Sequence, residues 1–146
     1  MATPMLVGLL KVAASDPKLK GMISHVGEDL HITGVDQSRP WALGTLAHHA
    51  PVLVVTATSR EAEDLTAELT AMLGEKVAMF PAWETLPHER LSPGVDIIGR
   101  RAEVLHNLDR LQVIVTAARG LSQPCLLYTS DAADEEDKVD HGGRRP

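Results

Sequence analysis

The chain has 146 residues, of which 44% are apolar and 23% are charged, and its formal net charge is −6. This length suits one domain, and the composition is that of a globular protein, so a fibrous or wholly disordered chain is excluded. A net negative charge gives no electrostatic reason to expect a nucleic-acid-binding domain. The single cysteine excludes an internal disulfide and a multi-cysteine zinc site.

The sequence predicts no association with a membrane. Its fully apolar runs are only a few residues long, as in 52–55, whereas a transmembrane helix needs about 20 residues. The N-terminus lacks the charged, apolar and small-residue order of a signal peptide. We therefore expect a cytoplasmic protein.

The last 22 residues, 125–146, differ in character from the rest of the chain. They hold its only cysteine and its only tyrosine, together with six acidic and three basic residues. Residues 125–135 read as the translation of a transposase-adapter DNA string, and 139–145 match the adjoining primer string except for His141 in place of leucine. We predict that 125–146 is a disordered, adapter-derived artefact and that the native chain continues past Pro124. A genuine acidic tail is the alternative.

The first part of the chain predicts a helical extension followed by a strand. Residues 1–28 contain short apolar stretches that favour helix. Polar and apolar residues then alternate over 29–33, which is typical of a strand. A loop over 34–39 follows, and Pro40 suits the first turn of the next helix.

The middle of the chain predicts two strands around an amphipathic helix. Residues 52–55 form a short β-branched run that favours a buried parallel strand. Thr58 and Glu61 have the spacing of a capping box, and Gly74 is a suitable helix stop. A second strand is expected over 76–80. The apolar stripe of the helix is predicted at Ala62, Leu65, Leu69, Met72 and Leu73.

The remaining elements repeat the same alternation. Ser92 and Pro93 predict a helix start, residues 112–116 predict a buried strand, and a short helix is expected over 117–121. The buried stripe of the longer helix is predicted at Val95, Ile98, Ala102, Leu105 and Leu108. Strands that alternate with helices indicate an α/β fold with a parallel sheet flanked by helices.

The loop around Gly34 lies where nucleotide-binding α/β folds hold phosphates. A working phosphate loop needs several glycines, a lysine for the β- and γ-phosphates and a hydroxyl for magnesium. Here Gly34 is the only glycine, no lysine follows, and Pro40 removes one N–H donor. We interpret Gly34, Ser38 and Arg39 as a degenerate phosphate-loop position that binds no cofactor.

The segment 80–93 is the second candidate for chemistry. It holds Glu84, His88, Glu89 and Arg90, a set that includes a possible general base. No second histidine or cysteine completes a metal site, so we expect neither a catalytic residue nor a metal ligand. The favoured interpretation is that Trp83 and Leu86 pin this segment onto the sheet while its charged side chains are solvated.

Two further groups of charged side chains have structural interpretations. His48 and His49 are adjacent on a helix, so they point about 100° apart and cannot chelate one ion together. Arg100, Arg101 and Arg110 have the charge to contact phosphates. Neighbouring acidic residues partly neutralise that positive charge, so the favoured interpretation is that these arginines lie on a solvated helix face.

Two segments carry a family resemblance. Residues 52–65 and, above all, Trp83-Glu-Thr-Leu-Pro-His-Glu-Arg-Leu-Ser-Pro-Gly-Val-Asp96 with 99–101 resemble the N-terminal region of the bacterial transcription-repair coupling factor. The resemblance extends from Leu30 to Pro124, and the motif that begins at Trp83 is specific to the family.

The resemblance implies a role within a larger protein. The full-length family member is an ATP-driven, helicase-like DNA translocase that displaces stalled RNA polymerase and recruits nucleotide-excision repair. Its N-terminal module is similar to the excinuclease-B protein and contacts the excinuclease-A protein. Residues 29–124 would be the first half of a split, excinuclease-B-like and P-loop NTPase-like domain whose second half comes from later sequence. ATP and magnesium would bind beyond residue 124.

These implications predict a non-catalytic scaffold fragment. Two alternatives remain, namely a free-standing nucleotide-binding α/β enzyme that uses the 34–39 loop and a small protein-interaction domain. Measurable ATP affinity that Arg39→Ala abolishes would favour the enzyme. A native gene that ends near Pro124 would favour the interaction domain.

Overall fold

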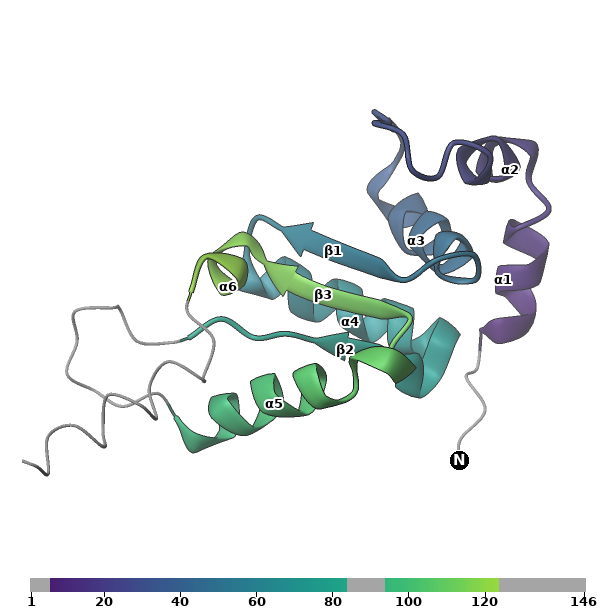
Figure 1. Cartoon of the computed structure of the whole chain (residues 1–146). Helices are drawn as coiled ribbons and strands as arrows, with labels where there is room; N and C mark the ends of the chain where they lie inside the picture. Colours follow the sequence, from purple (N-terminus) through teal and green to yellow (C-terminus); the bar gives the residue numbers. More distant parts are fainter. Residues whose placement is uncertain (1–5, 84–93, 124–146) are drawn as a thin grey trace, which may run out of the picture.

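The computed structural model describes residues 6–83 and 94–123, which form an α/β fold with a small parallel sheet flanked by helices (Figure 1). The expected α/β class, a parallel sheet flanked by helices, is therefore confirmed. The elements, in chain order, are α1 (Val7–Ala13), α2 (Pro17–Ile23), α3 (Arg39–Ala47), β1 (Val52–Thr56), α4 (Ser59–Leu73), β2 (Val77–Met79), α5 (Val95–His106), β3 (Val113–Ala117) and α6 (Ala118–Ser122).

The sheet has the strand order β1-β3-β2, and both neighbours of β3 run parallel to it. Val113 lies opposite Val52 on one side and opposite Val77 on the other, so the strands start in register. The strands predicted over 52–55, 76–80 and 112–116 are confirmed, with the second one shorter than expected. The central strand is thus the last of the three in the sequence.

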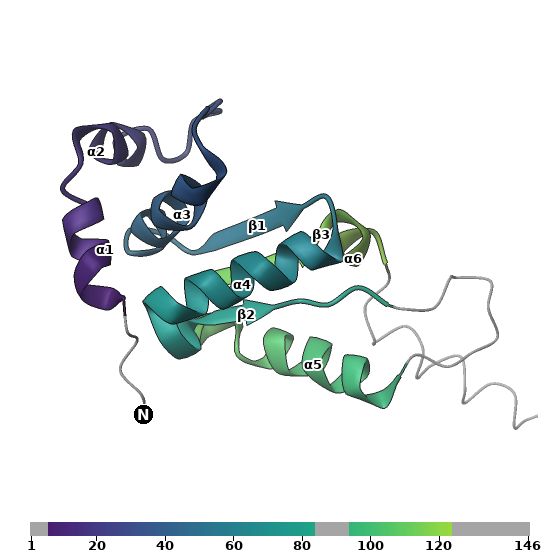
Figure 2. The same ribbon diagram turned by 180° about the vertical axis from the view of Figure 1, so that it is seen from behind.

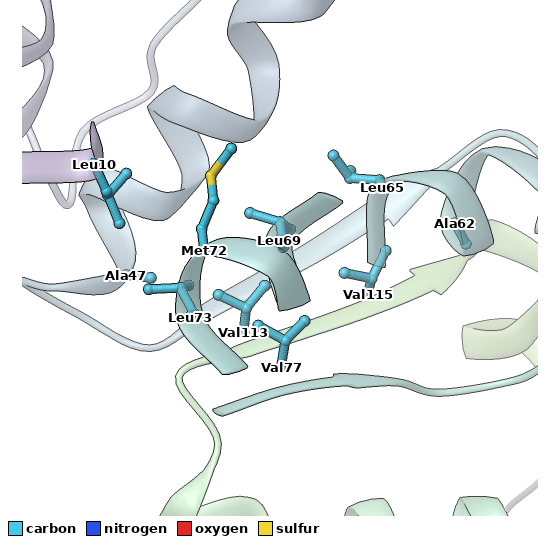
Figure 3. Packing of buried hydrophobic residues seen from close by; sticks show 10 residues of the cluster. All are labelled: Leu10, Ala47, Ala62, Leu65, Leu69, Met72, Leu73, Val77, Val113 and Val115. Atoms are coloured by element: carbon cyan, nitrogen blue, oxygen red, sulfur yellow. The ribbon is translucent and has the colours of Figure 1, made fainter. Parts of the chain in front are cut away.

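Helix α4 forms where its capping residues predict it. The Thr58 hydroxyl oxygen accepts a hydrogen bond from the backbone N–H of Glu61 at 3.1 Å, and Gly74 ends the helix with φ +66°. All five residues of the predicted stripe are buried, as Figure 3 shows, and they pack on Val77, Val113 and Val115. Burial of each large apolar side chain contributes about 1.5–3 kcal/mol to the free energy of folding. The contact between α4 and the sheet buries several such side chains and forms the centre of the core.

The two faces of the sheet differ in cover. Helix α4 lies across one face, as Figure 2 shows, and Figure 1 views the opposite face with β1 and β3 in front. Val52 and Val54 pack toward the core, so Leu53 and Val55 point away from it and are 56% and 49% exposed. The expectation of a buried strand is therefore wrong for one face of β1, because no described element covers the face that carries Leu53 and Val55.

The N-terminal helices pack onto the α4 side of the fold. Leu10 of α1 is fully buried and belongs to the core cluster. Helices α1 and α3 approach closely at Gly44, where an added Cβ would lie 3.0 Å from Leu10 Cδ1. The Asp16 carboxylate caps α2 by accepting from the backbone N–H of Lys18 at 2.8 Å.

The strand expected over 29–33 is absent from the structure. These residues pair with no strand and are exposed, with Leu30 at 46% and Ile32 at 60%. A period-two pattern records which side chains favour burial, but a strand forms only where a partner supplies backbone hydrogen bonds. The described residues supply no such partner, so the prediction is wrong for this chain.

The buried stripe predicted for α5 is also wrong. Val95 is 82% exposed and Leu105 is 39% exposed, and Leu108 just beyond the helix is 48% exposed. The residues that α5 buries are Arg101 and Val104. The predicted helix start at residues 92–93 lies outside the described residues.

We predict that residues 1–124 expressed alone will be poorly stable or will aggregate. Leu53, Val55 and the edge of β1, which no described strand pairs, offer an apolar surface and backbone groups to other copies. Size-exclusion chromatography with thermal melting tests this, and Leu53→Thr together with Val55→Thr should reduce association. A cooperative, monomeric transition above about 50 °C, an ordinary value for a mesophilic domain, would contradict the prediction.

Candidate functional site

The degenerate phosphate-loop residues lie beside the N-terminus of α4, where that helix follows β1. The side chain of Arg39, which begins α3, forms an ion pair with Glu61 in the first turn of α4. This is the carboxyl edge of the parallel sheet, the place where open α/β folds bind ligands. The loop therefore has a location suited to phosphate binding. Whether it can bind phosphate depends on the polar and charged groups of the loop.

Internal contacts occupy the polar groups of this loop. The Ser38 hydroxyl donates to the backbone carbonyl of Val35 at 2.7 Å. An added Cβ at Gly34 would lie 3.1 Å from Ser38 Oγ, so the turn is tight. The guanidinium of Arg39 is shared between Glu61 and Asp36, the latter at 3.4 Å.

The negative charge around this position disfavours the binding of a polyphosphate. A depression of about 420 Å³ has a lining with four carboxylates and only two guanidinium groups. The lining residues are Asp36, Gln37, Arg39, Pro40, Thr58, Arg60, Glu61, Asp64, Leu65 and Glu68. Like charges a few ångströms apart repel, so these carboxylates disfavour a phosphate chain here.

Glu61 also supplies negative charge next to the N-terminus of α4. Its Oε2 atom accepts from the backbone N–H of Ala57 at 3.3 Å, just before α4 begins. Backbone N–H groups at a helix N-terminus attract negative charge, and here a carboxylate of the chain itself supplies it. The geometry agrees with the prediction that the loop binds no nucleotide, which remains a prediction.

A buried arginine in the middle of α5 joins that helix to α6 and to the segment that follows β2. Arg101 is 1% exposed, and its Nη1 donates to the carbonyl oxygen of Pro81 at 2.7 Å. It also reaches the carbonyl oxygen of Gly120, at 3.4 Å. Its guanidinium carbon lies 4.1 Å from the centre of the Phe80 ring and 4.5 Å from that of Trp83. The solvated face expected for Arg101 is therefore wrong, since carbonyls and aromatic rings replace water around its charge.

Trp83 is held in place on its other side by Gln123. The Gln123 side chain accepts from the backbone N–H of Trp83 at 2.6 Å and donates to its carbonyl oxygen at 3.2 Å. Trp83 is buried and contacts Arg101 and Gln123. Its pinning onto the sheet stays a prediction, and Leu86 lies outside the described residues. The role of Gln123 could not be foreseen, because a glutamine after a short helix carries no local signal of its partner.

The close packing at this brace requires a glycine at position 120. An added Cβ at Gly120 would lie 2.5 Å from Thr116 Oγ1 and 3.5 Å from the carbonyl oxygen of Phe80. Thr116 is fully buried, so it has no room to withdraw. The absence of a side chain at Gly120 thus lets α6 fold back against the end of the sheet.

A second depression, of about 510 Å³, opens beside the brace at the carboxyl edge of the sheet. Two arginines from different helices, Arg100 and Arg119, contribute to its lining, and both are exposed. The other lining residues are Ser59, Glu63, Met79, Pro81, Ala82 and Trp83. No sequence pattern singled out Arg119, because its proximity to Arg100 depends on the fold.

The other candidate residues do not assemble into a site in the structure. His48 and His49 are exposed at the end of α3, and Arg110 is exposed, as expected. Among residues 6–83 and 94–123 no group of three or more His, Cys, Asp or Glu side chains could hold a metal ion. The candidates Glu84, His88, Glu89 and Arg90 lie outside the described residues.

The same described part of the chain contains no helix long and apolar enough to cross a membrane. No protein-family model matches the chain. The fold and the two depressions define a small parallel α/β module.

Curated relatives identify the family of this module. The chain is 42% identical over 131 residues to the transcription-repair-coupling factors of Mycobacterium bovis and Mycobacterium tuberculosis, with 82% of the chain covered. It is 31% identical over 78 residues to that of Escherichia coli, with 52% of the chain covered. The chain belongs to the transcription-repair-coupling factor family as a fragment or domain. It spans 11% of the length of the mycobacterial relatives and 7% of the Escherichia coli one.

We predict that Arg101→Ala will loosen the region where β2, α5 and α6 meet. The change removes the donor to two buried carbonyls and the cation between two rings, a loss of about 3 kcal/mol. Hydrogen exchange of residues 113–123 in the full-length protein should accelerate by about a hundredfold. Arg100→Ala, on the same helix but exposed, is the matched control and should change stability by less than about 0.5 kcal/mol. Equal protection in both variants would contradict the role of Arg101.

Proposed function

We propose that this segment is a non-catalytic scaffold in the repair module of a transcription-repair-coupling factor. The observation that carries the proposal is the 42% identity to two such factors across 82% of the chain. The degenerate loop around Arg39, with its acidic surroundings, supports a structural role over nucleotide hydrolysis.

The activity of the whole protein follows from the family resemblance. The full-length protein uses ATP to translocate on DNA, displaces stalled RNA polymerase and recruits nucleotide-excision repair through the excinuclease-A protein. ATP and magnesium bind beyond residue 124, in a helicase-like part of the protein, and the protein acts in the cytoplasm. The present segment supports the module that receives the repair proteins.

The uncovered parts of the fold support a split domain. Among the described residues, nothing pairs with the outer edge of β1 or covers the face that carries Leu53 and Val55. A second half of the domain, from later sequence, would supply strands for that edge and side chains for that face. The segment would then be the first half of a P-loop NTPase-like domain.

We predict that the 146-residue chain has no measurable affinity for ATP with magnesium. Four carboxylates line the depression at the degenerate loop, and Glu61 already occupies the N-terminus of α4. Titration with a fluorescent ATP analogue, with and without Arg39→Ala, checks this, and both proteins should give the same flat response. Saturable binding that Arg39→Ala abolishes would support the nucleotide-binding enzyme instead.

Deletion of this segment from the full-length protein should separate two activities. Because the ATP site and the translocase lie elsewhere, ATP-driven release of a stalled RNA polymerase from a DNA template should persist. Capture of the excinuclease-A protein in a pull-down should be lost, because the module that contacts it no longer folds. A deletion variant that abolishes polymerase release but keeps binding of the excinuclease-A protein would refute the scaffold role.

A further inference from the structure

The depression beside the Arg101 brace brings together two exposed arginines that are 19 residues apart in the sequence. Arg100 projects from α5 and Arg119 from α6. Neither forms an ion pair with any residue in 6–83 or 94–123, in contrast to Arg39 in the neighbouring depression. Two guanidinium groups at one cavity can bind an oxyanion through charge-assisted hydrogen bonds.

The local charge differs in sign from that of the chain. The lining holds two arginines and one carboxylate, Glu63, so its formal charge is +1. Residues 1–124 carry 11 basic and 14 acidic residues and therefore a formal charge of −3. The neighbouring depression around Arg39 has the opposite balance, with four carboxylates and two arginines. An isolated positive cavity on an acidic surface selects a ligand with local negative charge and repels a long polyanion.

Part of the lining of the depression is apolar and braced. Met79, Pro81 and Trp83 contribute to its lining. Pro81 and Trp83 are fixed by Arg101, and Trp83 also by Gln123. A lining held by these contacts loses little conformational entropy when a ligand binds, which favours affinity. It offers contact to an apolar group next to the oxyanion.

We propose that this depression is a docking site for an acidic peptide segment of a partner protein. Arg100 and Arg119 bind a carboxylate of the peptide, and an adjacent aliphatic or aromatic side chain packs on Met79, Pro81 and Trp83. A duplex nucleic acid fits less well, because its affinity depends on many phosphate contacts and this depression offers two arginines beside one carboxylate. This site is separate from the degenerate phosphate loop and does not depend on the proposed scaffold role.

The test measures peptide binding by the full-length protein that contains this segment. The probe is a fluorescein-labelled peptide of alternating Glu and Leu, followed by fluorescence anisotropy at low and high salt. Replacement of both arginines by glutamate should weaken binding at least about tenfold, and each single Arg→Gln change about threefold to tenfold. Arg110→Glu, an exposed arginine outside the depression, is the matched control and should leave the affinity unchanged.

Further measurements distinguish an acidic peptide from other ligands. A peptide with Gln in place of each Glu should lose most of its affinity, and added salt should weaken the acidic peptide. Lys variants at both positions, which keep the charge, should retain part of the binding and so exclude misfolding as the cause. The proposal is overturned if the double Glu variant binds the acidic peptide as the unchanged protein does. It is also overturned if a DNA duplex depends on these arginines and the peptide does not.

Discussion

The packing of α4 on the central strand β3 is the contact on which the rest of the fold depends. The outer strands form no hydrogen bonds with each other, so within the described residues each is attached to the sheet only through β3. The buried stripe of α4 spans all three strands and supplies most of the apolar cover that holds them. Cover of this kind lies on one face of the described fold only, so Leu53 and Val55 are left exposed on the second face.

Local signals predicted the elements whose stabilising contacts are near in sequence. The capping residues, the stripe from Ala62 to Leu73 and the stop at Gly74 are all found as expected, because one helix and one sheet face satisfy them. The strand predicted over 29–33 is absent, because none of the described residues supplies backbone hydrogen bonds to it. The α5 stripe failed because Arg101, a residue that hydrophobicity assigns to solvent, is buried among aromatic rings and carbonyl groups.

The two candidate sites also show that local sequence does not predict contacts between residues far apart in the chain. The degenerate loop was recognised from the residues it lacks, and the structure adds that Glu61 and its acidic neighbours occupy its surroundings. The cavity between Arg100 and Arg119 was not foreseen, because 19 residues and a whole strand separate them in the chain. Such convergence at the carboxyl edge is a property of parallel sheets, where distant loops meet.

The position of β3 has a consequence for synthesis on the ribosome. Its residues pair with β1 residues 61 positions earlier, as in Val52 with Val113, so the sheet cannot assemble until the last strand is made. At about 5–20 residues per second, translation leaves both outer strands without hydrogen-bonding partners for several seconds. Helix α4 can form during that interval, but its apolar stripe has no central strand to cover. The nascent chain is therefore a candidate for chaperone binding during this interval.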